Sequence, residues 1–294
     1  INCIKHLQAT ALEAGVDIDM YDVFDQEGER TPILTAVRPI GPLSIEAFEA
    51  AGGARGIMKS LEPMLDTDVL TVTGKTVAEN LDGFEVSDGH VIRPLDNPWG
   101  SEAAIVLLKG SFAPETGVVK VGLRTPDRKL SFKGKARVYD TAVDAEDDLK
   151  AGKIQKGDVL VLRRQGVKGG PGMGGASRLV FAVEGAGFGP DVAVVTDGQL
   201  SGLVNKGLVV GEVQPEWADG GPIALVENGD EIEIDVNEKR IDLLVDEAEM
   251  ARRRAAFTPP PPTADSGWLS IYERTVSPLR RGASLIDSAR QRSD

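Results

Sequence analysis

Residues 159–202 read VLVLRRQGVKGGPGMGGASRLVFAVEGAGFGPDVAVVTDGQLSG, and this stretch decides the fold. Two apolar runs, 159–162 and 192–195, have the length and the β-branched content of buried strands. A polar loop rich in glycine follows each run, at 168–175 and at 197–202. Such a density of glycine is typical of backbone that takes positive φ angles or approaches a neighbouring group closely.

The two glycine loops together predict a site. Ligands of α/β proteins tend to bind beyond the carboxyl ends of strands, which is where both loops fall. Each loop by itself is read equally well as a tight turn, and the pair favours a site. The residues that we expect to bind a substrate are Lys168, Gly170 and Gly172 of the first loop and Asp197, Gly198 and Gly202 of the second.

Composition excludes several classes of function. The 294 residues are 41% hydrophobic and 27% charged, which predicts a globular protein with room for two domains. A formal net charge of -13 repels phosphate and anionic lipid, so we expect neither a nucleic-acid nor a membrane partner. The single cysteine, Cys3, excludes an internal disulfide and fits the reducing cytoplasm. The sequence has no apolar run that could span a bilayer and no leader pattern.

Residues 1–95 predict the remainder of an α/β domain, because helical patterns alternate there with short apolar runs. We expect helices over 1–12, 44–51 and 57–65, and a short apolar run at 69–72. The sequence begins inside the first helical pattern, without an initiator methionine or a capping residue. We interpret this start as that of a cut chain.

Residues 96–245 predict a β-barrel-like domain that carries both glycine loops. Short apolar runs separated by glycine favour strands over 103–108, 118–121, 130–132 and 136–139. Beyond an acidic helix at 144–149 come the two loops with a helix at 177–184 between them. Two hairpins are then expected, 223–226 with 231–236 and 231–236 with 240–245, turned at Asn228-Gly229 and Asn237-Glu238.

Residues 246–294 predict a helical tail. A helix over 246–256 leads into four prolines at 259–262, which form a stiff spacer. Trp268, Leu269, Tyr272 and Val276 then recur at helical spacing. We interpret this stripe as a surface that docks onto the body of the chain, with binding of a partner as the alternative.

Familiar catalytic motifs fail here on spacing. The phosphate-binding loop that ends in Gly74-Lys75-Thr76 would need a glycine at Val69. The glycines at 185–189 precede a strand and are read as a helix end. A nucleophile elbow at Ser201 would need glycine at Gln199, and the two histidines lie far from that serine in sequence. One cysteine and two histidines cannot close a structural zinc site.

After these exclusions, Ser201 remains as a candidate base or nucleophile. A serine hydroxyl is a poor base until a metal or an adjacent cation stabilises its alkoxide. The sequence alone identifies no such group. A hydroxyl that satisfies the turn backbone is the equally weighted structural alternative.

The whole chain resembles the carboxy-terminal half of the dihydroxy-acid and sugar-acid dehydratases. The blocks that carry the resemblance occur in order and are highly specific as a set. They are Gly52-Gly53 with Ile57-Met58-Lys59, TVTGKT at 71–76 with Glu79-Asn80, IRPLDNP at 92–98, Ala113-Pro114, AGKI at 151–154, KGGPGM at 168–173, DGQLSG at 197–202 and DGGPIALV at 219–226.

The resemblance implies a fold, a reaction and cofactors. It implies an α/β segment followed by a swivelling β-barrel-like domain and a docked helical tail, in a homodimer or tetramer. The implied activity is that of a hydro-lyase (a dehydratase): loss of water from a dihydroxy acid or sugar acid to give a 2-keto acid, as in branched-chain amino acid biosynthesis or carbohydrate-acid metabolism. An iron–sulfur cluster (2Fe-2S) and magnesium are implied as cofactors, with Ser201 as the residue that removes the proton beside the carboxylate.

Three departures from the family pattern leave two readings open. The cluster cysteines and most magnesium ligands belong to an amino-terminal half that this sequence lacks, so we assign no metal ligand to this chain. Gly175 stands where the family has an acidic magnesium ligand, and residues 164–167 read RQGV where the family usually has YEGP. The chain is therefore read as part of a dehydratase, favoured by the complete Ser201 loop, or as a non-catalytic paralogue that binds a sugar acid, favoured by Gly175.

Overall fold

The structure is a computed structural model that describes residues 2–126, 128–168, 170–202, 207–259, 261 and 264–285. The chain divides into two compact units. The first unit comprises residues 1–26, 105–121 and 127–294, and the second comprises 27–104 and 122–126. Both glycine loops belong to the first unit.

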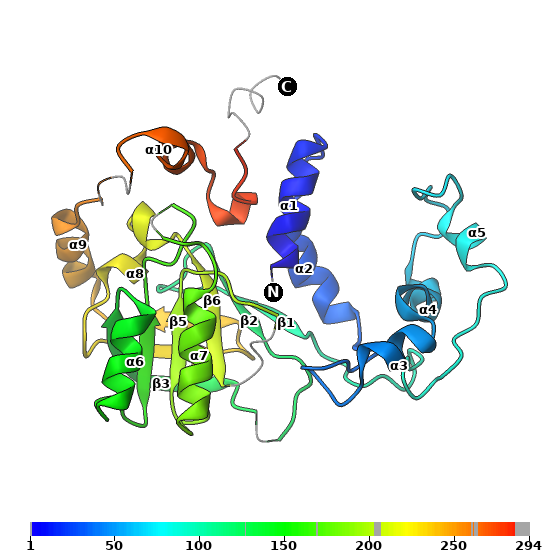
Figure 1. Cartoon of the computed structure of the whole chain (residues 1–294), viewed down its shortest axis with the longest axis horizontal. Coiled ribbons are helices and arrows are strands. Elements are labelled where there is room, and N and C mark those ends of the chain that lie inside the picture. The colour runs from blue at the N-terminus through cyan, green and yellow to red at the C-terminus, as the bar shows by residue number, and fades with distance from the viewer. Residues whose placement is uncertain are drawn as a thin grey trace. The chain divides into compact units, whose positions relative to one another are not determined.

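The first unit is built around a mixed sheet (Figure 1). Within the described residues it has eight strands in the order β1-β2-β6-β5-β4-β3-β7-β8. The four central strands run parallel, and the strands on either side are antiparallel to their neighbours. The bounds are Ile105–Leu108 (β1), Thr116–Lys120 (β2), Ser131–Tyr139 (β3), Asp158–Leu162 (β4), Ala193–Thr196 (β5), Leu208–Gln214 (β6), Glu231–Asp235 (β7) and Arg240–Leu243 (β8).

The two edges of this sheet meet. The backbone N–H of Lys109, just after β1, donates to the carbonyl of Lys239 at 2.9 Å. The N–H of Ile241 in β8 donates to the carbonyl of Lys109 at 3.1 Å. These bonds nearly close the sheet into a barrel, which removes most of the exposed edge. The barrel-like domain expected from the sequence is therefore confirmed.

Two helices cover one face of the sheet. The helices α6 (Ala142–Lys150) and α7 (Gly175–Gly185) lie side by side against it (Figure 1), and Arg178 of α7 donates to Glu146 of α6 at 2.7 Å. Every residue of β4 and β5 is buried, as expected for parallel strands that are covered. The expected strands at 159–162 and 192–195 and the helices at 144–149 and 177–184 are confirmed, with shifts of a few residues at their ends.

The remaining helices of the first unit come from the two ends of the chain. The first helix, α1 (Cys3–Glu13), is confirmed, and Ile4 on it is fully buried. A second helix, α2 (Met20–Arg30), was not predicted; its first residues belong to this unit. Towards the carboxyl end follow η2 (Trp217–Asp219), α8 (Pro222–Leu225), α9 (Glu247–Ala256), α10 (Gly267–Thr275) and η3 (Leu279–Arg281).

The second unit is helical and has a small core of Ala51, Val91 and Ile92. Its helices are α3 (Ile45–Ala50), α4 (Gly53–Leu61), η1 (Glu62–Met64) and α5 (Val77–Leu81), so the helices expected near 44–51 and 57–65 are confirmed. The apolar run 69–72 forms no strand in the described part of this unit. It makes one isolated bridge, Leu70 to Thr76, and Val72 is fully exposed, because a tight turn at Gly74 folds the run back on itself.

Two strand predictions were wrong in the first unit. Residues 223–226 belong largely to a short helix, α8, because Pro222 at its first position fixes a helical φ angle. The first predicted hairpin therefore does not form, whereas the second is confirmed as β7 paired with β8. The runs 130–132 and 136–139 belong to one strand, β3, and its Gly134 passes close to the carbonyl of Gly157. Strand β6 was not predicted.

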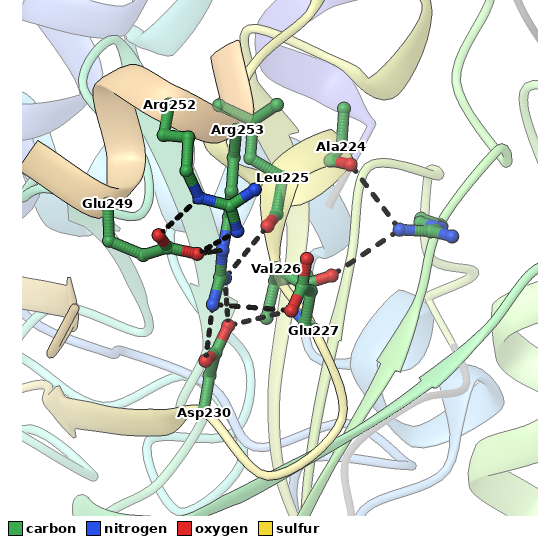
Figure 2. A network of polar contacts seen from close by, with 9 residues as sticks. Ala224, Leu225, Val226, Glu227, Asp230, Glu249, Arg252 and Arg253 are labelled. Carbon is green, nitrogen blue, oxygen red and sulfur yellow. Dashed lines mark hydrogen bonds and ion pairs between the residues drawn. The ribbon is translucent and has the colours of Figure 1, made fainter. Parts of the chain in front are cut away.

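Helix α9 is fastened to the barrel by Arg253 (Figure 2). The guanidinium of Arg253 donates to Asp230 at 2.5 and 3.1 Å and to the carbonyl of Leu225 at 3.0 Å. Glu249 of the same helix accepts a fourth bond from Arg253 at 2.8 Å. The charge of the buried guanidinium is thus balanced on both sides, as a buried cation requires.

No helix within the described ranges is long and apolar enough to cross a membrane.

Candidate active site

The two glycine loops leave neighbouring strands and meet. Strands β4 and β5 are parallel and in register, with Leu162 opposite Thr196, so both loops start at the same edge of the sheet. The backbone N–H of Gln199 donates to the carbonyl of Gly172 at 2.9 Å, which bonds the second loop to the first. The structure thus brings together the two segments that the sequence predicted to form a site.

A buried carboxylate, that of Asp197, holds the start of both loops. One oxygen accepts from the backbone N–H of Gln165 at 2.9 Å, and the other accepts from that of Trp217 at 2.9 Å. Asp197 is fully buried, and this burial raises its pKa to about 6. In this structure Asp197 positions backbone; the contact with substrate that the sequence suggested stays a prediction.

A second buried carboxylate, that of Glu216, binds the backbone at the start of the first loop. Its two oxygens accept from the backbone N–H groups of Val167 at 2.9 Å and Lys168 at 2.8 Å. Burial, together with the nearby charge of Asp197, raises the pKa of Glu216 to about 7. Two acids therefore lie in apolar surroundings, where backbone amides are their main partners.

Several glycines of the loops are required by packing within the protein. A β-carbon on Gly166 would lie 2.4 Å from the carboxyl carbon of Glu216, and one on Gly170 would lie 2.0 Å from the carbonyl oxygen of Arg164. A β-carbon on Gly198 would lie 2.6 Å from that of Gln165. These distances are far below van der Waals contact. Gly170 therefore lets two backbone segments pass each other, whereas Gly166 and Gly198 leave room for the side chains of Glu216 and Gln165.

Gly172 and Gly202 differ from those three glycines. Gly172 has a φ angle of 76°, which a residue with a β-carbon rarely adopts. A β-carbon on Gly202 would meet no described atom within 4 Å, so this exposed position faces open space. Within the described residues, the second loop therefore reaches the surface at Gly202, next to Ser201.

Ser201 is half-buried and its backbone is fixed by the neighbouring helix. Its backbone N–H donates to the hydroxyl of Ser177 on α7 at 3.2 Å. Lys120, on β2, donates from its ammonium group to the carbonyl of Gly202, one residue beyond Ser201. Burial and the charge of Arg128 lower the pKa of Lys120. An ammonium group therefore lies beside the loop that carries the candidate base.

Lys168 lies at the rim of the first loop. Its ammonium group donates to Asp219 at 2.7 Å, and both side chains are partly exposed. Gly170, the other rim residue predicted to bind substrate, is exposed. Lys168 thus has a partner in this structure, and its predicted contact with substrate stays a prediction.

Sequence reasoning missed four residues that shape the site: Lys120, Gln165, Ser177 and Glu216. Ser177 and Lys120 lie on a helix and a strand whose local patterns look ordinary. Glu216 follows the end of a strand by two residues, where a carboxylate is usually solvated. One signal could have indicated that Glu216 is buried: it lies between Pro215 and Trp217, and both neighbours favour a packed turn.

The described residues contain no cluster of metal-binding side chains. Among the residues that the structure describes, no three His, Cys, Asp or Glu side chains gather closely enough to hold a metal ion. Cys3 is exposed and is the chain's one cysteine, whereas iron–sulfur clusters are held by several thiolates. At Gly175, the space in which an acidic side chain would begin is taken by the carboxamide oxygen of Gln165. We therefore derive no reaction step through a cluster or a metal.

Family models match nearly the whole chain. Residues 90–283 match the model described as "Dihydroxy-acid/6-phosphogluconate dehydratase C-terminal". Residues 1–80 match the corresponding model described as "N-terminal". The two matches do not overlap and are separated by residues 81–89, and the carboxy-terminal match contains both glycine loops.

Curated proteins named dihydroxy-acid dehydratase are similar to this chain over most of its length. The protein of Oleidesulfovibrio alaskensis is 43% identical over 286 residues, which are 96% of this chain and 51% of that protein. Those of Carboxydothermus hydrogenoformans and Methanothrix thermoacetophila are each 42% identical, over 97% of this chain and 51% and 52% of their own lengths. The chain thus spans about half the length of the relatives it matches.

Proposed function

The chain belongs to the dihydroxy-acid/6-phosphogluconate dehydratase family, and on that premise we propose that it contributes the carboxy-terminal half of a hydro-lyase. The proposed reaction removes water from a 2,3-dihydroxy acid or sugar acid and yields a 2-keto acid. The observation that carries the proposal is the similarity over 96% of the chain, combined with an accessible Ser201 loop bonded to the glycine loop.

In the proposed reaction Ser201 is the base. Its deprotonated oxygen takes the proton from the carbon beside the carboxylate, and the hydroxyl of the next carbon leaves, with a proton, as water. The enol that forms then tautomerises to the 2-keto acid, so that one water is lost overall. The ammonium group of Lys120 beside Gly202 supports this assignment, because a nearby cation favours the alkoxide of a serine.

The finer features implied by the family belong to the same proposal. The cofactors that the family resemblance implies, magnesium and an iron–sulfur cluster, would be held mainly by residues outside this chain. We propose a division into residues 1–95, a swivelling β domain over 96–245 and a docked tail over 246–294, within a homodimer or tetramer. Burial of Val276 and Leu279 against Val167 of the first loop supports the docked tail.

The alternative is a non-catalytic paralogue that binds a sugar acid. One observation favours the paralogue: the carboxamide of Gln165 fills the space beside Gly175 in which the family has a carboxylate. We favour the enzyme, since the second loop keeps the whole DGQLSG sequence, with a half-buried serine beside the exposed Gly202.

An assay of the complete protein separates the two functions. The protein encoded by the full reading frame, loaded anaerobically with iron and sulfide, is tested for 2-keto acid release from a panel of dihydroxy and sugar acids. The enzyme is expected to convert at least one acid, with a rate that rises with magnesium. Background rates on every acid, together with a thermal shift caused by one of them, would establish the paralogue instead.

A further inference from the structure

Gln165 has a fixed side-chain orientation. It follows β4 and is buried, and its backbone N–H is bonded to Asp197. Its carboxamide nitrogen donates to the carbonyl oxygens of Asp140 at 3.3 Å and Arg163 at 3.2 Å. A flipped amide would turn its oxygen toward these two carbonyls, which are also acceptors, so the hydrogen bonds determine where the oxygen points.

The carboxamide oxygen of Gln165 points at Gly175, the first residue of α7. A β-carbon at position 175 would lie 2.2 Å from this oxygen and 3.2 Å from the carboxamide carbon. No other described heavy atom outside the local backbone would come within 4 Å of that β-carbon. The carboxamide is thus the one group among the described residues that prevents a side chain at 175.

Gln165 also touches the second loop. Its β-carbon would lie 2.6 Å from a β-carbon on Gly198, three residues before Ser201. Helix α7, which Gln165 contacts through Gly175, carries Ser177, the acceptor for the backbone N–H of Ser201. Gln165 therefore packs between the two segments that hold the candidate base.

We propose that Gln165 and Gly175 are a matched pair that determines the charge of this part of the site. The carboxamide of Gln165 takes the volume of a side chain at position 175 and supplies a neutral hydrogen-bond acceptor there in place of a carboxylate. A neutral oxygen held in this way binds hydroxyl donors and is a poor ligand for a divalent cation compared with a carboxylate. The chain accordingly holds no divalent cation between β4 and the start of α7.

A double-mutant cycle on the 294-residue chain tests the pairing. Gly175→Ala forces the carboxamide to move and to give up its two bonds to backbone carbonyls. The expected melting temperature is about 2 °C or more below that of Gly185→Ala, the matched control. Gly185 is at the other end of α7, where a β-carbon meets no described atom within 4 Å. In a Gln165→Ala background, the two alanine variants are expected to differ by less than about 1 °C.

The outcomes of this cycle are decisive in either direction. If Gly175→Ala does not fold but Gln165→Ala/Gly175→Ala does, the pairing is supported. Equal stability of Gly175→Ala and Gly185→Ala, an additive cycle, or a double variant that does not fold would each overturn it.

Manganese binding tests the neutral character of the pair. Free Mn²⁺ is measured by its electron paramagnetic resonance signal during titration of the wild-type chain and of Gln165→Ala. The two chains are expected to bind Mn²⁺ equally, because the carboxamide holds no cation. Saturable binding in the wild type that is lost in Gln165→Ala would contradict the proposal. Neither measurement uses dehydratase activity, so a failure of this pairing is distinguishable from a failure of the proposed function.

Discussion

Glu216 and Asp197 are buried acids whose protonation is linked to stability. Their pKa values rise from the ordinary 4.5 and 3.8 to about 7 and about 6 in the folded chain. The folded state therefore holds these protons more tightly than the unfolded state does. Their contribution to stability is fully present below about pH 4 and is lost as the pH rises through about 6 and 7.

Glu216→Gln should remove much of this pH dependence. Between pH 5 and pH 8 the free energy of unfolding of the wild type should fall by about 2–3 kcal/mol more than that of the variant. Urea unfolding of both proteins at the two pH values measures the difference. The exposed Glu238→Gln serves as control and should follow the wild type. Identical pH dependence in Glu216→Gln and the wild type would show that the carboxylate does not titrate as described.

At the scale of single residues, the sequence identified the loop that carries Ser201 but not the residues that surround it. The loop 197–202 could be recognised because its residues are contiguous and glycine-rich. Glu216, just after β6, and Lys120, on β2, contact loops that lie 48 and 82 residues away in sequence, and their placement depends on strand order. Local patterns carry no information on that order, so these residues could not be predicted.

Arg253 is the residue through which α9 is fastened, and its loss should be costly. Its side chain is only 10% exposed, and Arg253→Met would leave the similarly buried Asp230 without its ion-pair partner. We expect a loss of about 3 kcal/mol in the free energy of unfolding. The neighbouring Arg252→Met is the matched control, because Arg252 is 66% exposed and should cost no more than about 0.5 kcal/mol. Chemical denaturation of the two variants gives both values; equal losses would contradict the account of Figure 2.

Helices and strands were predicted correctly where the pattern of apolar residues was clear. The predictions were wrong where contacts between distant segments determined the structure. The buried strands β4 and β5 were predicted because each contains a run of apolar residues rich in valine. Residues 223–226 have the same composition, yet Pro222 and the turn before it start a helix. Strand β3 was predicted as two pieces because Gly134 interrupts its apolar run, whereas in the sheet that glycine permits close approach of Gly157.

At the scale of the whole molecule, the barrel could be anticipated from the spacing of its strands, but its closure could not. Closure depends on Lys109 bonding to backbone about 130 residues further along the chain. The α/β character expected for residues 1–95 rested on the run 69–72, which is an exposed turn. The pattern of apolar residues does not reveal that these side chains are exposed.

The chain by itself should carry no iron–sulfur cluster and show no dehydratase activity. Cluster assembly needs several thiolates, and the chain has one cysteine. Iron and acid-labile sulfide are measured after anaerobic reconstitution of the 294-residue chain, alongside the keto acid assay. Stoichiometric iron and sulfide with a visible charge-transfer spectrum would overturn this expectation.

The central claim is that the Ser201 loop is the reactive edge of the molecule, and the turnover of Ser201→Ala in the complete protein tests it most directly. Loss of a positioned base should lower kcat by at least ~100-fold. The melting temperature should stay unchanged, and Ser266→Ala, at an exposed serine whose side chain forms no cap, should keep full activity. A Ser201→Ala protein that folds normally and retains near-normal kcat would contradict the claim and leave Ser201 as a residue of the turn.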